Sequence, residues 1–547
     1  MEIKSFCIHA FLVVILSTCL TEGSPLASPE PKGCSAAPTT GEESSSWPDI
    51  IRSLAEKPIG VIEDIYAKIT GWGKQPRQQA PRESDGRQYA ILMDAGSSGT
   101  RVGIYTWTSS CADVGHLLNI TALTDPVDGQ QVGKKIKPGL SSRANDPDSA
   151  TSYIEVLLDF AAAHIPPEKQ AETPLYILAT AGMRLLTQEQ QDAIYNNLLT
   201  NIPKKYQFKL GPHHIETITG KEEGVYSWVS INYLSHKLDR VDKVTGKREP
   251  TIGMIEMGGA SAQIAFEITS EEHMDEIVKK SGAKAAKDLQ EYLYHLDLGT
   301  TTPNEAGKTY LLYSRTFLGL GADAARRTYL STLILGSDAY ADLVSGSDLK
   351  KLTVSDPCLP PGSQSTAQFL DADGKPIQVD LQGIGSFQEC NVILQSLVDS
   401  ENPCHPADTT CPLKELKETG VGFEDHDFDG LGQLYYSLTD LIKKEGSFNY
   451  EKVAGQVEGE CNGSARRKRQ SSLAVSADEK ISTLTCFKSA WTLTFLHQEL
   501  LMPSTYTHFN TLDQIDGISA DYPLGALLVK SLSLPRNCPQ SAPVSNC

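Results

Sequence analysis

The stretch Ile91-Leu92-Met93-Asp94-Ala95-Gly96-Ser97-Ser98-Gly99-Thr100-Arg101 is an apolar segment that ends in a carboxylate and runs into a turn of small residues. The same pattern returns at Gly253-Met254-Ile255-Glu256-Met257-Gly258-Gly259-Ala260-Ser261-Ala262-Gln263. A second apolar segment follows each copy, Val102 to Trp107 in the first and Ile264 to Phe266 in the second. The pattern predicts two β-hairpins, each with a carboxylate at the end of its first strand.

The chemistry of both turns indicates phosphate. Glycine lets backbone N–H groups come close to an anion, and serine and threonine hydroxyls add further donors. The carboxylates of Asp94 and Glu256 repel phosphate, so we expect them to hold a metal ion or its water shell. One such turn is usually only a tight hairpin, but two matching copies predict phosphate, metal and water together.

Composition is that of a globular protein. The chain has 547 residues, of which 40% are apolar and 21% charged, which is enough for two or more domains. Its formal net charge of −19 argues against nucleic-acid binding through a broad basic face, although a local cationic pocket for a nucleotide is compatible with it.

The N-terminus predicts entry into the secretory pathway. Lys4 and the apolar run Phe6 to Leu20 are typical of a signal peptide cleaved after Gly23. Residues 1–23 would then be removed, and the mature protein would be secreted or extracellular. The alternative is an uncleaved anchor, which would place the protein in the Golgi or ER lumen or at the cell surface. We expect no other membrane contact, because the apolar segment Leu524 to Leu534 is short and contains Lys530.

Cysteine usage agrees with that compartment. Ten cysteines remain after the signal, which favours disulfides in an oxidising compartment, and none forms the Cys-x-x-Cys pair of a zinc site. Asn119 and Asn462 begin glycosylation acceptor sequences. The basic run Arg466 to Arg469 is expected in an exposed loop.

Strands and helices are expected to alternate from about residue 88, which favours an α/β fold. We expect residues 24–87 to be a disordered or stalk-like linker. A strand is predicted at Leu175 to Thr180 and a helix after Lys221, where the aromatic stripe that includes Trp228 is interpreted as core. Further helices are predicted at Arg315 to Tyr329 and Phe487 to Leu501.

Paired phosphate hairpins resemble those of the actin, hexokinase and Hsp70 superfamily, and a fuller match is to the apyrases, the nucleoside triphosphate diphosphohydrolases. The resemblance spans about residues 88–530 and rests on blocks that occur in the family's order. These blocks are Asp94 to Arg101, Lys137 to Leu140, Ala179 to Leu186, Glu222 to Leu234 and Glu256 to Ile264.

The resemblance implies two lobes of actin/hexokinase/Hsp70-like (ribonuclease H-like) architecture with a nucleotide cleft between them. Lobe I would span residues 88–219 and lobe II residues 220–509, and residues 510–547 would return to lobe I. The implied activity is hydrolysis of the terminal phosphate of nucleoside tri- or diphosphates with Ca²⁺ or Mg²⁺. Oligomeric state is left open.

Site residues follow by position within the blocks. Glu223 matches the general base that activates water, with Glu222 as its rival, and Ser261 and Gln263 match residues that orient the water. Asp94 and Glu256 match the carboxylates that hold the metal through water. The residues that match the phosphate cradle are Ser97, Ser98, Gly99, Thr100, Thr180, Ala181, Gly258, Gly259 and Ala260. Tyr436, with Tyr435 as an alternative, matches the aromatic that stacks on the nucleobase.

Three departures from the family pattern stand out. The family usually has Asp at position 256, often Thr at Ala262, and Trp at Tyr522, so metal preference is the property most open to change. The similarity also implies three disulfides in the second lobe, which are Cys358 with Cys390, Cys404 with Cys411, and Cys461 with Cys486.

Two other function classes agree less well with the sequence. A secreted nucleotide-binding protein with little turnover would not need the water-handling residues Glu223, Ser261 and Gln263. A chaperone or cytoskeletal ATPase switch is disfavoured by the signal sequence and the cysteines.

Overall fold

The computed structural model describes residues 86–108, 117–238, 244, 248–268, 290–299, 309–344, 351–370, 376–401, 423, 426–445, 447–463 and 484–532. All of them belong to one compact unit, Gly86–Cys547. The signal, the linker, the basic run and the Cys404–Cys411 pair fall outside these residues. Within the described part of the chain, no helix has the length and apolar character needed to span a bilayer.

The first six-stranded sheet contains the first predicted hairpin. Its strand order is β3-β2-β1-β5-β6, and β4 pairs with β2. Strands β1 and β2 are antiparallel, and β5 continues the sheet in parallel to β1. The strands are β1 (Arg87–Ala95), β2 (Thr100–Thr108), β3 (Thr121–Ala122), β4 (Gly133–Ile136), β5 (Leu175–Ala179) and β6 (Ile215–Thr217).

The second six-stranded sheet contains the second hairpin. Its order is β15-β14-β7-β8-β10-β9, with β7 and β8 antiparallel and β14 parallel to β7. The strands are β7 (Gly253–Met257), β8 (Ser261–Glu267), β9 (Leu293–Asp297), β10 (Thr309–Leu318), β14 (Phe428–Gly432) and β15 (Phe509–Thr511). Both hairpin predictions are confirmed.

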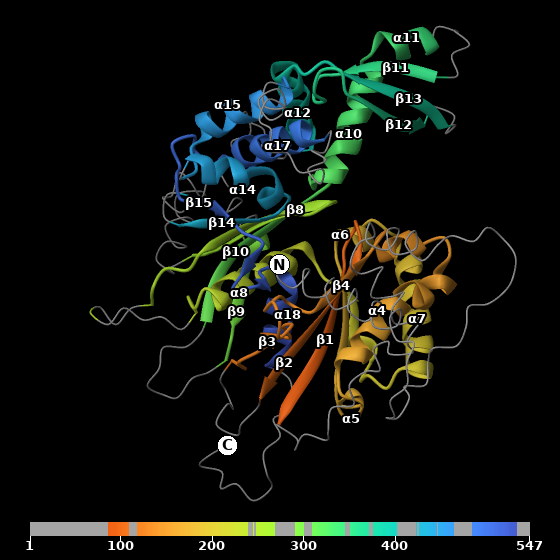
Figure 1. Ribbon diagram of the computed structural model, residues 1–547, viewed down its shortest axis with the longest axis vertical. Coiled ribbons are helices and arrows are strands. Elements are labelled where there is room, and N and C mark those ends of the chain that lie inside the picture. Colours follow the sequence, from red (N-terminus) through yellow and green to blue (C-terminus); the bar gives the residue numbers. More distant parts are fainter. Residues whose placement is uncertain are drawn as a thin grey trace, which may run out of the picture. The chain divides into compact units, whose positions relative to one another are not determined.

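Alternate residues of β1 face two different cores, as the two-residue period of a strand requires. Ile91 and Met93 pack with helices α4 (Ala150–His164) and α7 (Gln188–Lys205), which lie beside this sheet in Figure 1. Leu92 faces the opposite way, into a core that also includes residues of the second sheet.

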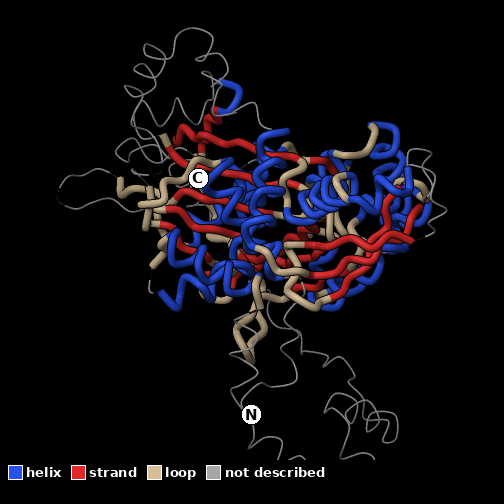
Figure 2. Tube along the Cα trace, turned by 90° about the horizontal axis from the view of Figure 1, so that it is seen from above, coloured by secondary structure: helices blue, strands red, loops and turns tan. Residues whose placement is uncertain are grey.

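Two helices, α8 (Gly220–Leu234) and α18 (Tyr522–Ser531), fill that shared core and lie between the sheets (Figure 1). They approach closely, since a Cβ built on Gly525 would lie 1.9 Å from the carbonyl oxygen of Tyr226. Trp228 is fully buried here, so the interpretation of its stripe as core is confirmed. Figure 2 shows the resulting interleaving of strands and helices.

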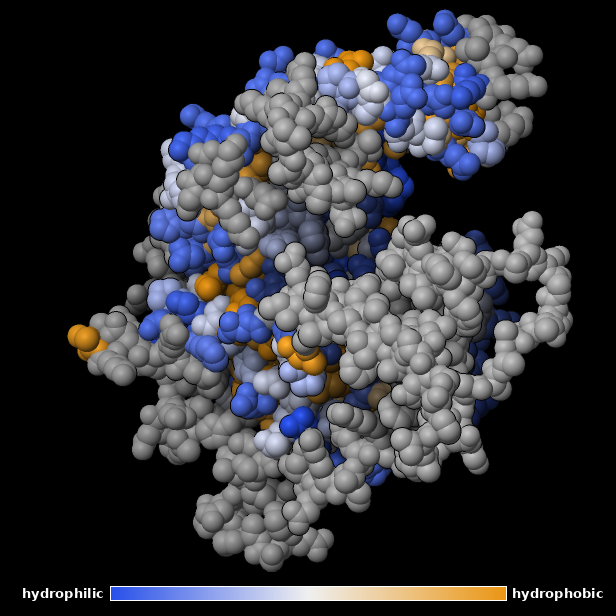
Figure 3. Space-filling model, in the orientation of Figure 1, coloured by the Kyte–Doolittle hydropathy of each residue, from blue (hydrophilic) through white to orange (hydrophobic). Residues whose placement is uncertain are grey.

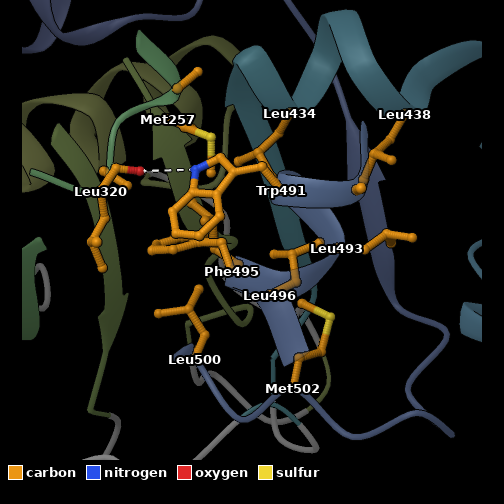
Figure 4. Close-up of a cluster of buried hydrophobic side chains, with 14 of the residues drawn as sticks. Met257, Leu320, Leu434, Leu438, Trp491, Leu493, Phe495, Leu496, Leu500 and Met502 are labelled. Atoms are coloured by element: carbon orange, nitrogen blue, oxygen red, sulfur yellow. Dashed lines mark hydrogen bonds between the residues drawn. The ribbon is translucent and has the colours of Figure 1, made fainter. Parts of the chain in front are cut away.

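Outer helices cover the far face of the second sheet. They are α10 (Ala322–Leu335), α12 (Phe387–Glu401), α14 (Gln433–Glu445), α15 (Tyr450–Cys461), α17 (Thr485–Thr494) and the π-helix η6 (Phe495–Glu499). Trp491 of α17 lies at the centre of this core, where its indole N–H donates to the Leu320 carbonyl at 3.2 Å (Figure 4). The predicted pairs Cys358–Cys390 and Cys461–Cys486 are present as disulfides.

One predicted helix is wrong. Residues Arg315 to Tyr329 do not form a single helix, because Arg315 lies in β10 and α10 begins only at Ala322. Gly319 separates the two elements with a φ of +94°, a conformation that glycine adopts at low cost. The helix predicted at Phe487 to Leu501 is confirmed as α17 with its π-helical end.

A small three-stranded sheet with its own apolar core extends from α10. It comprises β11 (Lys351–Asp356), β12 (Gln364–Leu370) and β13 (Pro376–Gly383) beside α11 (Asp338–Val344). In Figure 3 its visible surface is largely hydrophilic. The remaining short elements are η2 (Leu140–Arg143), η3 (Pro147–Ser149), α5 (Pro167–Gln170), α6 (Ala181–Arg184), η4 (Pro212–His214), β16 (Gln514–Ile515) and β17 (Ile518–Ser519).

Candidate active site

Two adjacent glutamates in the first turn of α8 have different roles. Thr219 and Glu222 form a capping box, in which the Thr219 hydroxyl accepts from the Glu222 N–H at 3.1 Å. The Glu222 carboxylate in turn accepts from the Thr219 N–H at 2.8 Å. Glu222 therefore starts the helix, and the next residue, Glu223, points elsewhere.

Glu223 is only 7% exposed and is held by two partners. Its Oε2 accepts from the guanidinium of Arg184, the last residue of α6, and from the Gln263 side-chain amide at 3.1 Å. Burial raises the pKa of Glu223, and the adjacent Arg184 charge opposes that rise. No role was predicted for Arg184 from the sequence, although it lies in one of the quoted blocks.

Ser261 and Gln263 occupy alternate positions on β8, so both side chains face the central layer. The Gln263 amide nitrogen donates to the Ser261 hydroxyl at 2.7 Å as well as to Glu223. Both residues are buried, at 2% and 1% exposure. The three residues assigned to water handling therefore form one hydrogen-bonded group drawn from a helix and a strand.

Asp94 lies near the end of β1 on the same face as Leu92. The Tyr522 hydroxyl at the start of α18 donates to it at 2.9 Å. Burial raises the pKa of Asp94 to about 6, while nearby Arg101 acts in the opposite direction.

Glu256 occupies the corresponding place on β7, next to the end of that strand. The Ser227 hydroxyl of α8 donates to its Oε2 at 2.7 Å. Burial, followed by the neighbouring Glu223 carboxylate, raises the pKa of Glu256 to about 8. The two central helices thus each supply a hydroxyl to one of the paired carboxylates.

The two glycine turns face each other. A Cβ built on Gly259 would lie 2.8 Å from the Ser97 hydroxyl, so the second turn approaches the first at this point. Gly139 packs closely behind the first turn, since a Cβ built on it would lie 2.3 Å from the Gly96 carbonyl oxygen. The N–H groups of Ala322 and Asp323, at the start of α10, bind carbonyls of the second turn at 2.9 Å.

A cavity of about 380 Å³ lies between the turns. The predicted residues that line it are Asp94, Ser97, Ser98, Thr180, Ala181, Glu223, Glu256, Gly258, Gly259, Ala260, Ser261 and Tyr436. Four predicted residues do not line it, which are Gly99, Thr100, Gln263 and Tyr435. Gln263 lies behind Ser261 and Glu223, and Thr100 is fully buried.

Charged residues of both signs line this cavity. The acidic ones are Asp94, Glu223, Glu256, Asp323, Asp513 and Asp521. The basic ones are Arg101, Lys135, Lys137 and Lys488, none of which was assigned a role from sequence. Because acidic side chains outnumber basic ones, a polyphosphate entering the cavity would require additional positive charge.

Asp94 and Glu256 fit a hard divalent cation. Carboxylate oxygens are the ligands that Ca²⁺ and Mg²⁺ take, and both carboxylates line the cavity between the turns. Among the described residues, no three acidic, histidine or cysteine side chains are grouped so as to hold a metal ion. The pair therefore suits an ion that keeps much of its water shell, as Mg²⁺ commonly does.

The candidate nucleobase contact is Tyr436, at the start of α14. Its side chain is 68% exposed, and its hydroxyl donates to Asp513 at 3.4 Å. Tyr435 packs against it, with ring centroids 5.3 Å apart, but does not reach the cavity.

Known proteins resemble this chain over most of its length. A family model described as the GDA1/CD39 (nucleoside phosphatase) family matches residues 81–542. A protein named ectonucleoside triphosphate diphosphohydrolase 7, from Xenopus tropicalis, is 32% identical over 468 residues, which cover 82% of this chain and 74% of that protein. Nucleoside-diphosphatase mig-23, from Caenorhabditis elegans, is 30% identical over 457 residues, 81% of this chain and 77% of that protein.

One solved structure supports the fold. The crystal structure of nucleoside triphosphate hydrolases from Neospora caninum matches with a TM-score of 0.50 and 16% identity, over 82% of this chain and 93% of that chain. The α/β architecture expected from the alternation of strands and helices is therefore confirmed.

Proposed function

Because the chain belongs to the GDA1/CD39 (nucleoside phosphatase) family, we propose that it hydrolyses the terminal phosphate of nucleoside tri- and diphosphates. The products would be inorganic phosphate and a nucleotide shortened by one phosphate, ending at the nucleoside monophosphate. The residues proposed to carry the reaction are those that line or back the cavity between the glycine turns.

The observation that carries this proposal is the group formed by Glu223, Ser261 and Gln263. A protein that only binds nucleotide needs donors for phosphate, but it does not need a buried carboxylate beside them. The Glu223 carboxylate lines the cavity, burial raises its pKa and so makes it a stronger base, and the Arg184 charge limits that rise and favours the ionised form that can accept a proton.

In the proposed reaction, Glu223 takes a proton from a water molecule that contacts Ser261, while Gln263 orients this water indirectly by holding Glu223 and Ser261 from behind. The water oxygen forms a bond to the terminal phosphorus while the bond to the bridging oxygen breaks in line with it. The backbone N–H groups of the two turns would stabilise the charge on the transferring phosphoryl group. A Ca²⁺ or Mg²⁺ ion held through water by Asp94 and Glu256 would supply neutralising positive charge.

Phosphate release from ATP, ADP, UDP and GDP, with Ca²⁺ or Mg²⁺, tests the proposal. Glu223→Gln should lower kcat by roughly 100-fold or more, since a general base typically contributes that much. Glu222→Gln is the matched control, because it changes the adjacent residue in the same way but alters only a capping box. Full activity in Glu223→Gln together with loss in Glu222→Gln would reverse the assignment.

Absence of phosphate release with every nucleotide and both metals would replace hydrolysis by nucleotide binding without turnover. The secretory signal supports a secreted or luminal location, which cell fractionation with N-terminal sequencing would test.

A further inference from the structure

A second cavity of about 310 Å³ adjoins the one between the glycine turns. Seven residues line both cavities, and they are Asp94, Arg101, Lys135, Tyr436, Asp513, Ser519 and Asp521. The glycine turns line only the first, whereas Leu92, Tyr105 and Gln131 line only the second. The shared residues therefore mark where a bound molecule would pass from the phosphate cradle into a less polar chamber.

Arg101 lies at this junction, and its position is fixed by strand pairing. It is directly opposite Asp94 on β1 and directly opposite Lys135 on β4. Residues that face each other across neighbouring strands point to the same side of a sheet. Asp94, Arg101 and Lys135 therefore form a row across the sheet, in which Arg101 lies between the metal-binding candidate and Lys135. The Lys135 side chain reaches the first glycine turn, since a Cβ built on Gly99 would lie 3.0 Å from it.

Asp521 is the present partner of Arg101. The guanidinium donates to the Asp521 carboxylate at 2.7 Å, and the two side chains are 38% and 22% exposed. The pair is partly buried, and both of its side chains line the two cavities, so an anion that enters either cavity can reach the guanidinium and compete with the carboxylate. A guanidinium binds phosphate through two parallel hydrogen bonds, which makes phosphate a strong competitor for it.

We propose that Arg101 binds the phosphate of the leaving nucleotide, and that Asp521 is the counter-ion which this phosphate displaces. This inference rests on the proposed function, because the leaving group is defined by the reaction. The transferred phosphate lies in the glycine turns, and the rest of the nucleotide extends past Arg101 towards Tyr436. Arg101 is then a specificity residue for the phosphorylated leaving group, separate from the cradle.

The two reaction products provide the test, because inorganic phosphate and a nucleoside monophosphate occupy the two parts separately. Binding of AMP, UMP and GMP, of the free nucleosides and of inorganic phosphate is measured by calorimetry in the parent and in Arg101→Met. Loss of a charge-assisted hydrogen bond predicts monophosphate binding weaker by roughly 10- to 100-fold. Binding of inorganic phosphate and of the free nucleosides should stay unchanged.

Asp521→Asn is the matched variant, because it removes the other half of the same ion pair. We expect it to tighten monophosphate binding, which is the opposite of the Arg101→Met effect. Arg101→Lys keeps the charge without the two-pronged geometry and should give an intermediate affinity. Thermal unfolding of all three variants shows whether each is folded. If Arg101→Met does not fold, the same comparison can be made with Arg101→Lys.

Three results would overturn the inference. If Arg101→Met weakens the binding of inorganic phosphate as much as that of the monophosphates, Arg101 belongs to the phosphate cradle. If it weakens the binding of the free nucleosides equally, Arg101 contacts the sugar or the base. Unchanged binding of all ligands would leave the ion pair purely structural. Calorimetry requires no turnover, so an inactive parent refutes the proposed function alone, whereas an active parent with unchanged monophosphate binding refutes this inference alone.

Discussion

Replacing Ser227 with alanine removes the hydroxyl that donates to the Glu256 carboxylate at 2.7 Å. Ser227 is fully buried, so a water molecule has no ready access to take over the bond. The Glu256 carboxylate would lose the donor that fixes its orientation and that favours its ionised form. A carboxylate proposed to bind metal through water would then have to be ordered by the metal itself, and the affinity for metal should fall.

The expected size of this effect comes from the bond that is lost. A hydrogen bond to a charged group contributes about 1.5–3 kcal/mol, and removing a partner that orients a metal ligand commonly weakens metal binding by about 10- to 100-fold. Thermal unfolding at increasing Ca²⁺ and Mg²⁺ concentrations measures this without reference to catalysis. Each tenfold loss of affinity should lower the stabilisation at saturating metal by about 1.4 kcal/mol.

Ser531→Ala is the control for Ser227→Ala. Ser531 is also fully buried, on α18, but its hydroxyl donates only to the Leu528 carbonyl, at 2.7 Å. It should lower stability with and without metal alike. If Ser227→Ala shows the same metal titration as the parent, Ser227 does not orient a metal ligand, and the prediction is refuted.

Two further predictions concern a buried acid and the second glycine turn. Glu499 is 1% exposed and burial raises its pKa from 4.5 to about 7, so the folded protein retains a proton that the unfolded chain releases above its ordinary pKa. The free energy of unfolding should therefore fall by about 3 kcal/mol as pH rises from 4.5 to 7. Urea unfolding should show this decline in the parent and not in Glu499→Gln. An equally steep decline in the variant would contradict the prediction. Gly259→Ala should raise KM for nucleotide, because the new Cβ would lie 2.8 Å from the Ser97 hydroxyl and 2.9 Å from the Asp323 carboxylate. Gly258→Ala is the control and should be tolerated, because its Cβ would meet only the Ser261 carbonyl, at 3.4 Å. Equal kinetic constants in the two alanine variants would show that the turns do not act on substrate at this point.

Local pattern was sufficient to predict much of the fold. The hairpins, β5 and α8 follow from apolar periodicity and from turn residues that act over a few positions. The failure at Arg315 has a physical cause as well. Most of β10 is buried, including consecutive residues from Leu312 to Arg315, so its sequence lacks the alternation of a half-exposed strand. The glycines at 319 and 321 were the available signal for a boundary.

The partners of the site residues could not be predicted in the same way. Tyr522 and Asp94 are 428 positions apart, and Arg101 and Asp521 are 420 apart, so only the packing of α18 against the first sheet brings them together. The sequence also could not decide which of Tyr435 and Tyr436 lines the cavity. Neighbouring residues on a helix point in different directions, so only one of the pair could line the cavity, and the helix register decided which.

The glutamate at position 256 can be understood from the layer between the sheets. Glu223, Glu256 and Asp94 come from a helix and two different sheets, yet each is held by a donor from a helix, namely Arg184, Ser227 and Tyr522. Glu256 is one methylene longer than the aspartate usual in the apyrases, which extends its carboxylate by about 1.5 Å. In this chain the extended carboxylate accepts the Ser227 hydroxyl from α8 at 2.7 Å, and we expect a shorter side chain to weaken or lose this hydrogen bond. The longer acid and the serine therefore act as one feature, and any change of metal preference should be sought in the two residues together.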